Sequence, residues 1–194
     1  MPRIILASRS KARIEMLVKA VLPFESIPAD IDEQAIAKGI QEADSIAMEL
    51  ARQKALAVSE KYPEALVIGS DQVLECEDSI LSKANNKEEA EGKLKFLRGK
   101  KHRLISGIAA AQNGKIIWQD SDEAYLTMRN FDDAFLQRYL NVAGEVLTSC
   151  AGAYALEESG AWLFEEVKGD YFTILGMPLI KLLNYLQNEH GVSV

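Results

Sequence analysis

The sequence has little cysteine and little histidine, and each shortage excludes a class of protein. Two cysteines, Cys76 and Cys150, are too few for a disulfide-built domain, and we interpret both as small buried side chains. With His102 and His190 as its two histidines, the chain lacks the Cys/His spacing of a zinc site. No apolar run reaches transmembrane length and no signal-peptide core is present, so we expect a cytoplasmic protein without membrane attachment.

The sequence also has fewer basic than acidic residues. The 22 Lys and Arg residues face 29 Asp and Glu residues, which gives a formal net charge of -7. An acidic chain repels the phosphates of long nucleic acids and of anionic membranes, so neither is an expected partner. A small anion can still bind where local cations and a helix N-terminus converge. A bound metal would have carboxylate and water ligands, which indicates Mg²⁺ or Mn²⁺.

Three familiar catalytic motifs are missing. The chain contains no G-x-G-x-x-G after a strand, no G-x-x-x-x-G-K-[ST] and no G-x-S-x-G. Their absence removes the support for a dinucleotide oxidoreductase, a P-loop enzyme and a nucleophile-elbow hydrolase.

Segments that suit strands alternate with segments of helical periodicity. Expected strands cover residues 4–7, 24–28, 65–69, 73–75, 102–111, 115–128 and 162–167, and expected helices cover 44–62, 88–97, 132–141 and 179–187, with a further helix capped by Ser10. Asn113-Gly114 predicts a hairpin between two of the strands. We therefore expect a single α/β domain over residues 1–194, with helices around a mixed sheet.

The turn at residues 6–13, with the sequence LASRSKAR, is the first candidate site. A buried strand leads through Ser8 and Ser10 into a helix, so free backbone N–H groups and a positive helix end point outward. Arg13 in the first turn adds a possible bidentate phosphate contact. The alternative is an ordinary capped helix with a solvated arginine.

The segment IGSD, residues 68–71, is the second candidate. Its apolar strand is expected to end at Ser70-Asp71, where an aspartate at the carboxyl end of a strand can hold a metal or activate water. The alternative is a turn or capping role. Glu33, Lys54 and Lys83 are further candidates, because carboxylates for a metal and cations for a polyphosphate form a coherent site. Lys54 lies on an apolar helix face, where a lysine ordinarily extends to water.

The order of these segments resembles the Maf family along nearly the whole chain. The matching residues are LAS-x-S with Arg13 and Glu15-Met16-Leu17, Ile31-Asp32-Glu33, Ala51-Arg52-Gln53-Lys54-Ala55, Gly69-Ser70-Asp71-Gln72-Val73, Ser82-Lys83, Leu97-Arg98-Gly99-Lys100-Lys101-His102, Ser106-Gly107, Ala151-Gly152-Ala153-Tyr154, Gly169-Asp170-Tyr171 and Gly176-Met177-Pro178-Leu179.

This resemblance implies a nucleoside triphosphate pyrophosphatase that cleaves between the α and β phosphates with a divalent metal. It implies an elongated mixed α/β fold, related to inosine-triphosphate pyrophosphatases, with a central cleft between two lobes. By resemblance, Asp71 is the proton acceptor and Glu33 helps Asp71 to hold the metal, while the phosphate-binding residues are Ser8, Arg13, Lys54 and Lys83. A homodimer is implied in the same way.

The sequence departs from the usual family pattern near the residues that select the base. Ala12 replaces a common arginine, and Ala84 stands where proline is usual. Gln72 with Glu157 is more similar to the branch that acts on 7-methyl-GTP than to the dTTP/UTP branch. A carboxylate can accept hydrogen bonds from the guanine N1–H and N2 edge and attract a methylated, cationic base.

Three readings of the function therefore stay open. The favoured one is a pyrophosphatase for 7-methyl-GTP, for another guanine nucleotide, or for another modified or non-standard nucleotide. The alternatives are a dTTP/UTP pyrophosphatase of the same family, and a non-catalytic nucleotide-binding regulator of septum formation. Glu157 beside Glu158 is otherwise an ordinary solvated loop residue.

Overall fold

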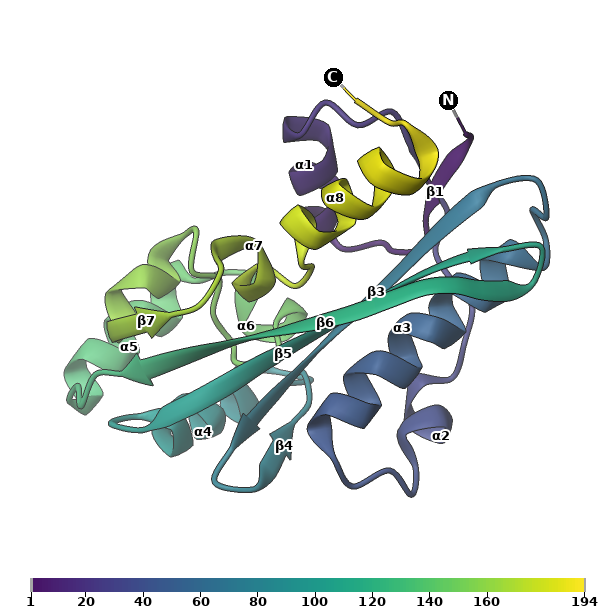
Figure 1. Cartoon of the computed structure of the whole chain (residues 1–194). Helices are drawn as coiled ribbons and strands as arrows, with labels where there is room; N and C mark the ends of the chain where they lie inside the picture. The colour runs from purple at the N-terminus through teal and green to yellow at the C-terminus, as the bar shows by residue number, and fades with distance from the viewer. Residues whose placement is uncertain (1, 194) are drawn as a thin grey trace. The chain divides into compact units, whose positions relative to one another are not determined.

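The computed structural model describes residues 2–193, and its strands form one mixed seven-stranded sheet (Figure 1). The order is β2-β1-β3-β5-β6-β7, with β4 paired to β3. The strands are β1 Ile4–Leu6, β2 Glu25–Ser26, β3 Leu66–Cys76, β4 Ser79–Leu81, β5 Lys101–Gln112, β6 Lys115–Met128 and β7 Phe164–Lys168. β1 runs parallel to β2 and β3, whereas β4 is antiparallel to β3 and β7 to β6. The expected mixed α/β class is confirmed.

Helices separate the strands along the chain. They are α1 Lys11–Lys19, α2 Glu33–Ala37, α3 Ala43–Ser59, α4 Lys87–Leu97, α5 Asp133–Val142, α6 Val146–Ser149, α7 Tyr171–Ile174 and α8 Leu179–His190, with a 3-10 helix η1 at Ser159–Leu163. The chain folds into two compact units. Unit 1 comprises Met1–Gln72, Ile105–Asp122 and Tyr171–Val194, and unit 2 comprises Val73–Leu104 and Glu123–Asp170. The elongated shape and the cleft between lobes stay predictions.

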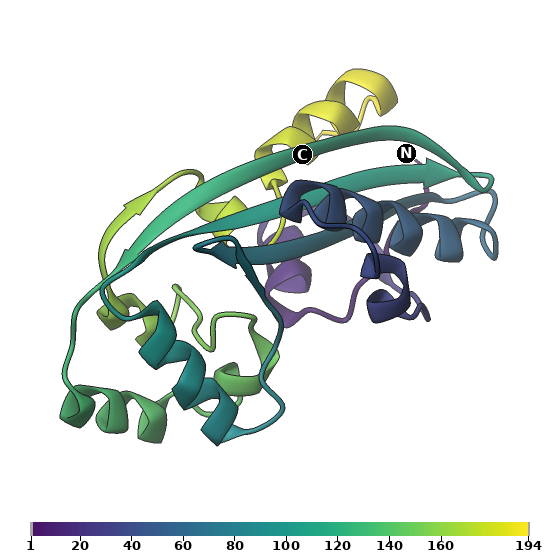
Figure 2. The ribbon, with the colours of Figure 1, turned by 90° about the horizontal axis from the view of Figure 1, so that it is seen from below.

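In unit 1, helices cover both faces of the sheet (Figures 1 and 2). Leu6 and Ile68 point to one face, where they pack in a core with Leu17 of α1 and Leu182 of α8. Successive residues of a strand face opposite sides of the sheet, so Gly69 lies on the face opposite Ile68. That face is covered by α3. A Cβ on Gly69 would lie 2.6 Å from the backbone nitrogen of Ala55, which shows how closely α3 approaches the sheet.

The hairpin expected at Asn113-Gly114 is confirmed. Both residues have positive φ values, 50° and 67°, and they join β5 to β6. Two consecutive positive φ angles match the right-handed twist of the flanking strands. Ser59, at the end of α3, accepts a hydrogen bond from the Gly114 backbone nitrogen at 3.0 Å.

In unit 2, α4 packs against α5 and α6 (Figure 2). In the same unit, His102 is 2% exposed and its Nε2 lies 2.7 Å from the Tyr154 hydroxyl. Burial lowers the pKa of His102 to about 4, so the imidazole is neutral at pH 7. Of the two cysteines, Cys76 is buried as expected, whereas Cys150 is only half-buried.

Several strand boundaries differ from the sequence-based expectation, and two of them change the position of a residue discussed above. The strand expected to end at Ser70-Asp71 continues to Cys76, because β3 turns back antiparallel into β4 and stays paired with β5. Ser70 and Asp71 are therefore mid-strand residues and not the carboxyl end of a strand. Trp162 was expected in a strand, but it lies in η1 and is 72% exposed, and β7 begins at Phe164.

Candidate functional site

Lys54 and Asp71 form the centre of the candidate site in unit 1. The Lys54 Nζ donates a hydrogen bond to Asp71 Oδ1 at 2.6 Å, and each side chain is 11% exposed. Asp71 lies on β3 between the part paired with β1, which ends at Ile68, and the part paired with β4, which begins at Leu74. At Asp71, this edge of β3 is therefore paired with neither β1 nor β4.

The packing of α3 explains why Lys54 does not extend to water. Its neighbours Ala51, Ala55 and Val58 are buried on the same side of the helix. Gly69 and Gly107 have no side chains to hold α3 away, so the lysine stem is enclosed and its ammonium meets Asp71. The alternative expectation of a lysine that extends along the apolar face to solvent is wrong for Lys54.

Glu33 brings a second carboxylate to the same ammonium. It is the first residue of α2, which is capped by Asp32 through a hydrogen bond from the Ala35 backbone nitrogen at 3.0 Å. Glu33 Oε1 lies 2.7 Å from Lys54 Nζ, although its side chain is 54% exposed. The structure thus brings Glu33, Lys54 and Asp71, three of the predicted site residues, together.

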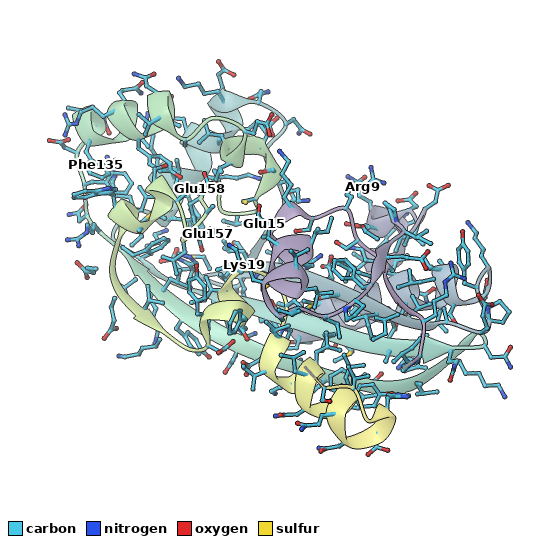
Figure 3. The ribbon with its side chains drawn as sticks, turned by 90° about the horizontal axis from the view of Figure 1, so that it is seen from above. Arg9, Glu15, Lys19, Phe135, Glu157 and Glu158 are labelled. Atoms are coloured by element: carbon cyan, nitrogen blue, oxygen red, sulfur yellow. The ribbon has the colours of Figure 1, made fainter. Side chains whose placement is uncertain are left out.

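The turn before α1 has the predicted capping geometry. Ser10 is the N-cap, and its side chain accepts a hydrogen bond from the Arg13 backbone nitrogen at 3.4 Å. The buried Ser8 hydroxyl accepts from the Ser10 backbone nitrogen at 3.1 Å, so it shapes the turn. Ala12 is half-buried in the first turn of the helix. The exposed Arg9 side chain of this turn is labelled in Figure 3.

Arg13 is a buried cation, contrary to the alternative of a solvated arginine. It is 9% exposed, and its Nε donates to the Gly176 carbonyl at 2.8 Å. Burial lowers the pKa of Arg13, while the charges of Asp71 and Glu33 raise it again. The charges of both carboxylates therefore favour the protonated form of the Arg13 guanidinium.

Ser70 and Gly176 are site residues that the sequence analysis quoted only as parts of motifs. Ser70 is fully buried, and its hydroxyl lies 2.8 Å from the Gly107 carbonyl and 3.0 Å from the Gly176 carbonyl. Gly107 and Gly176 are 37 and 106 residues away from Ser70 along the chain, so no local sequence pattern indicates these contacts. The positive φ of Gly176, +106°, explains the glycine there.

Gln72 has a fixed side-chain orientation. Its Nε2 has three oxygens within hydrogen-bonding distance for its two N–H groups: the carbonyls of Thr173 at 2.8 Å and Ile174 at 3.0 Å, and Ser106 Oγ at 3.1 Å. A flipped amide would place Oε1 against the two carbonyl oxygens, so the nitrogen must face them. The adjacent Asp71 points to the opposite face of β3.

Lys83 and Glu157, the remaining predicted site residues, belong to unit 2. Both are exposed, Lys83 just after β4 and Glu157 before η1, where Figure 3 labels it beside Glu158. Burial raises the pKa of Cys150, as does the charge of Glu157, while the charge of Lys83 opposes them. The charges of Lys83 and Glu157 thus act on the Cys150 thiol in opposite directions.

The carboxylates in unit 1 suit a metal that shares its coordination with substrate. Glu33 and Asp71 converge on one cation, the Lys54 ammonium. Mg²⁺ commonly binds one or two carboxylates and completes its shell with phosphates and water. Over residues 2–193, no group of three or more His, Cys, Asp or Glu side chains is placed to hold a metal. In the same range, no helix is both long and apolar enough to cross a membrane.

Comparisons with known proteins cover most of the chain. The family model described as Maf-like protein matches residues 3–189. A nucleoside triphosphate pyrophosphatase of Rhodopseudomonas palustris is 43% identical over 188 residues, which cover 96% of this chain and 93% of that protein. A 7-methyl-GTP pyrophosphatase of Brucella abortus is 41% identical over 195 residues, 98% of each chain. Among solved structures, a HAM1 protein from Coxiella burnetii is similar over 68% of this chain and 75% of that chain, with 16% identity and a TM-score of 0.47.

Proposed function

The chain belongs to the Maf-like protein family and is a nucleoside triphosphate pyrophosphatase, and we propose that Asp71 is the proton acceptor of its reaction. The observation that carries this proposal is the buried Lys54–Asp71 pair, with Glu33 on the same ammonium and Arg13 nearby. Such a cluster of acids and bases with opposing charges is typical of catalytic sites.

In the proposed reaction, water attacks the α-phosphorus and the bond to the oxygen that bridges the α and β phosphates breaks. Pyrophosphate leaves with that bridging oxygen, and the nucleoside monophosphate keeps the oxygen from water. Asp71 accepts the proton that the water loses. Lys54 holds one carboxylate oxygen, Oδ1, and so leaves Oδ2 as the acceptor for water.

Cationic groups of unit 1 stabilise the charge that develops on the phosphates. An ammonium has three N–H donors, and Lys54 directs two to Asp71 and Glu33, which leaves one for a phosphate oxygen. Arg13 offers its terminal nitrogens, and the N-terminus of α1 adds the positive end of its helix dipole. The corresponding roles of Ser8 and Lys83 stay predictions from the family resemblance.

Glu33 and Asp71 are the residues that would hold Mg²⁺ or Mn²⁺. When bound, such an ion withdraws charge from phosphate oxygens and lowers the pKa of coordinated water. For the substrate, we favour 7-methyl-GTP or another guanine nucleotide, which the exposed Glu157 carboxylate, the half-buried Gln72 and Ala12 would select. The name of the Brucella abortus relative supports this choice.

A panel of nucleotides tests the proposal. The protein is incubated with Mg²⁺ or Mn²⁺ and with 7-methyl-GTP, GTP, dTTP or UTP, and monophosphate, pyrophosphate and orthophosphate are quantified. Pyrophosphate release led by 7-methyl-GTP would support both reaction and substrate. Faster release from dTTP and UTP would overturn the substrate assignment. Orthophosphate without pyrophosphate would overturn the α–β cleavage, and nucleotide binding without products would favour a regulator.

A further inference from the structure

The carbonyl of Gly176 contacts two buried side chains, those of Arg13 and Ser70. It accepts a hydrogen bond from Arg13 Nε at 2.8 Å and lies 3.0 Å from the Ser70 hydroxyl. The same hydroxyl lies 2.8 Å from the Gly107 carbonyl, so its one proton is shared between the two carbonyls. Ser70 is fully buried in the middle of β3. Its contact with Gly176 therefore links the segment after α7 to the sheet.

This contact determines which part of the guanidinium faces a ligand. A guanidinium carries five N–H donors, one on Nε and four on the two terminal nitrogens. With Nε bound to Gly176, the fork of Nη1 and Nη2 is the pair left to meet two oxygens of one phosphate. Because Arg13 is only 9% exposed, its side chain has little freedom to choose another orientation.

The backbone of residue 176 fits this role only as glycine. Its φ of +106° lies in a region that residues with a side chain rarely adopt. A Cβ added there would lie 3.3 Å from Arg13 Nη2 and 3.4 Å from Nε. A side chain at this position would therefore strain the turn and press on the guanidinium.

We propose that Ser70 and Gly176 are positioning residues for Arg13. Ser70 fixes the Gly176 carbonyl, the carbonyl engages Nε, and the guanidinium then presents Nη1 and Nη2 end-on to a phosphate group of the substrate. This inference rests on the proposed function, because it takes Arg13 to be a phosphate ligand. Neither Ser70 nor Gly176 touches the substrate in this account.

A double-mutant cycle separates positioning from a general structural role. The probe is inorganic tripolyphosphate with Mg²⁺, measured by calorimetry, so that the result does not depend on the base or on turnover. Ser70→Ala is expected to weaken binding about 5- to 10-fold, which is the usual loss for one hydrogen bond. In an Arg13→Lys background, which lacks Nε and the fork, Ser70→Ala is expected to cause no further loss.

Ser59→Ala is the matched control, because Ser59 is also a fully buried serine of unit 1 whose hydroxyl bonds to the backbone, at Gly114. It is expected to leave tripolyphosphate affinity and the KM for nucleotide unchanged. Ser70→Ala is expected to raise that KM more than it lowers kcat. If Ser70→Ala fails to fold, Gly176→Ala in the wild-type and Arg13→Lys backgrounds provides the same comparison.

If Ser70→Ala lowers tripolyphosphate affinity equally in the wild-type and Arg13→Lys backgrounds, the positioning role is wrong. Wild-type protein that does not bind tripolyphosphate would also overturn it. These results are distinguishable from a failure of the proposed function. Normal pyrophosphate release with additive effects would refute the positioning role alone. Coupled losses in tripolyphosphate binding, without hydrolysis of any nucleotide, would refute the proposed reaction and keep the positioning role.

Discussion

The ammonium of Lys54 lies 2.6 Å from Asp71 and binds Glu33 at 2.7 Å, so one buried cation holds both acidic residues of the site. The lysine comes from the sheet-facing side of α3 and the aspartate from the middle of β3. The stability of unit 1 and the geometry of the proposed reaction therefore depend on the same contact.

Removing Lys54 is expected to cost more stability than removing the charge of Asp71. In Lys54→Met, two carboxylates lose their shared cation, and an unpaired buried charge costs about 3 kcal/mol. In Asp71→Asn, Lys54 keeps Glu33, so the loss is expected to be well under half of that. Urea unfolding at pH 7 measures both. Equal losses in the two variants would argue against a shared cation.

Gly69→Ala is expected to destabilise the protein and impair catalysis together. The new Cβ would meet the Ala51 carbonyl and lie 2.6 Å from the Ala55 backbone nitrogen, so α3 must shift and move Lys54 from Asp71. Overpacking of this kind costs about 1–3 kcal/mol.

Gly92→Ala provides the comparison for that variant. Gly92 is exposed inside α4, and nothing lies within 4 Å of its added Cβ. Alanine there is expected to stabilise the protein by about 1 kcal/mol, because glycine is a poor helix former. Thermal melts and pyrophosphate release of both variants test the pair. A neutral Gly69→Ala would contradict the close packing of α3.

Lys54, Ser70 and Asp71 show which features of the site the sequence predicts and which it does not. Helical periodicity placed Lys54 on an apolar face, and both the end of an apolar run and the family resemblance indicated Asp71, but none of these patterns contains the contact between the two residues. Ser70 and Asp71 were expected to end a strand, because an apolar run stops there and a polar pair resembles a terminus. Pairing with β5, along with the antiparallel return into β4, keeps β3 extended, and such long-range pairings leave no local pattern.

Protein stability is expected to fall as His102 becomes protonated. Burial lowers its pKa from 6.5 to about 4, so between these pH values the unfolded state binds more protons than the folded state. The stability that neutral His102 provides is therefore complete above pH 6.5 and is lost as the pH falls toward 4. The difference amounts to about 3 kcal/mol.

Urea unfolding of wild type and His102→Gln from pH 7 to pH 4 isolates this contribution, because the carboxylates titrate in both proteins. The stability difference between them is expected to shrink as the pH falls. A difference independent of pH would show that His102 does not stay neutral in the fold.

Metal removal is expected to stop the reaction without unfolding the protein. EDTA should abolish pyrophosphate release, and added Mg²⁺ or Mn²⁺ should restore it. In Glu33→Gln, the Mg²⁺ concentration for half-maximal activity is expected to rise at least about tenfold, because a metal site loses that much when even an indirect partner is removed. An unchanged Mg²⁺ dependence would remove Glu33 from the metal site.

The most direct test of Asp71 as proton acceptor compares Asp71→Asn with wild type in nucleotide binding and in pyrophosphate release. Glu64→Gln, which alters an exposed carboxylate paired with Arg3, serves as the control. Loss of a general base typically costs about 10²- to 10⁴-fold in rate. We predict that loss for Asp71→Asn, with nucleotide still bound and Glu64→Gln fully active. Asp71→Asn that releases pyrophosphate at the wild-type rate would contradict the account.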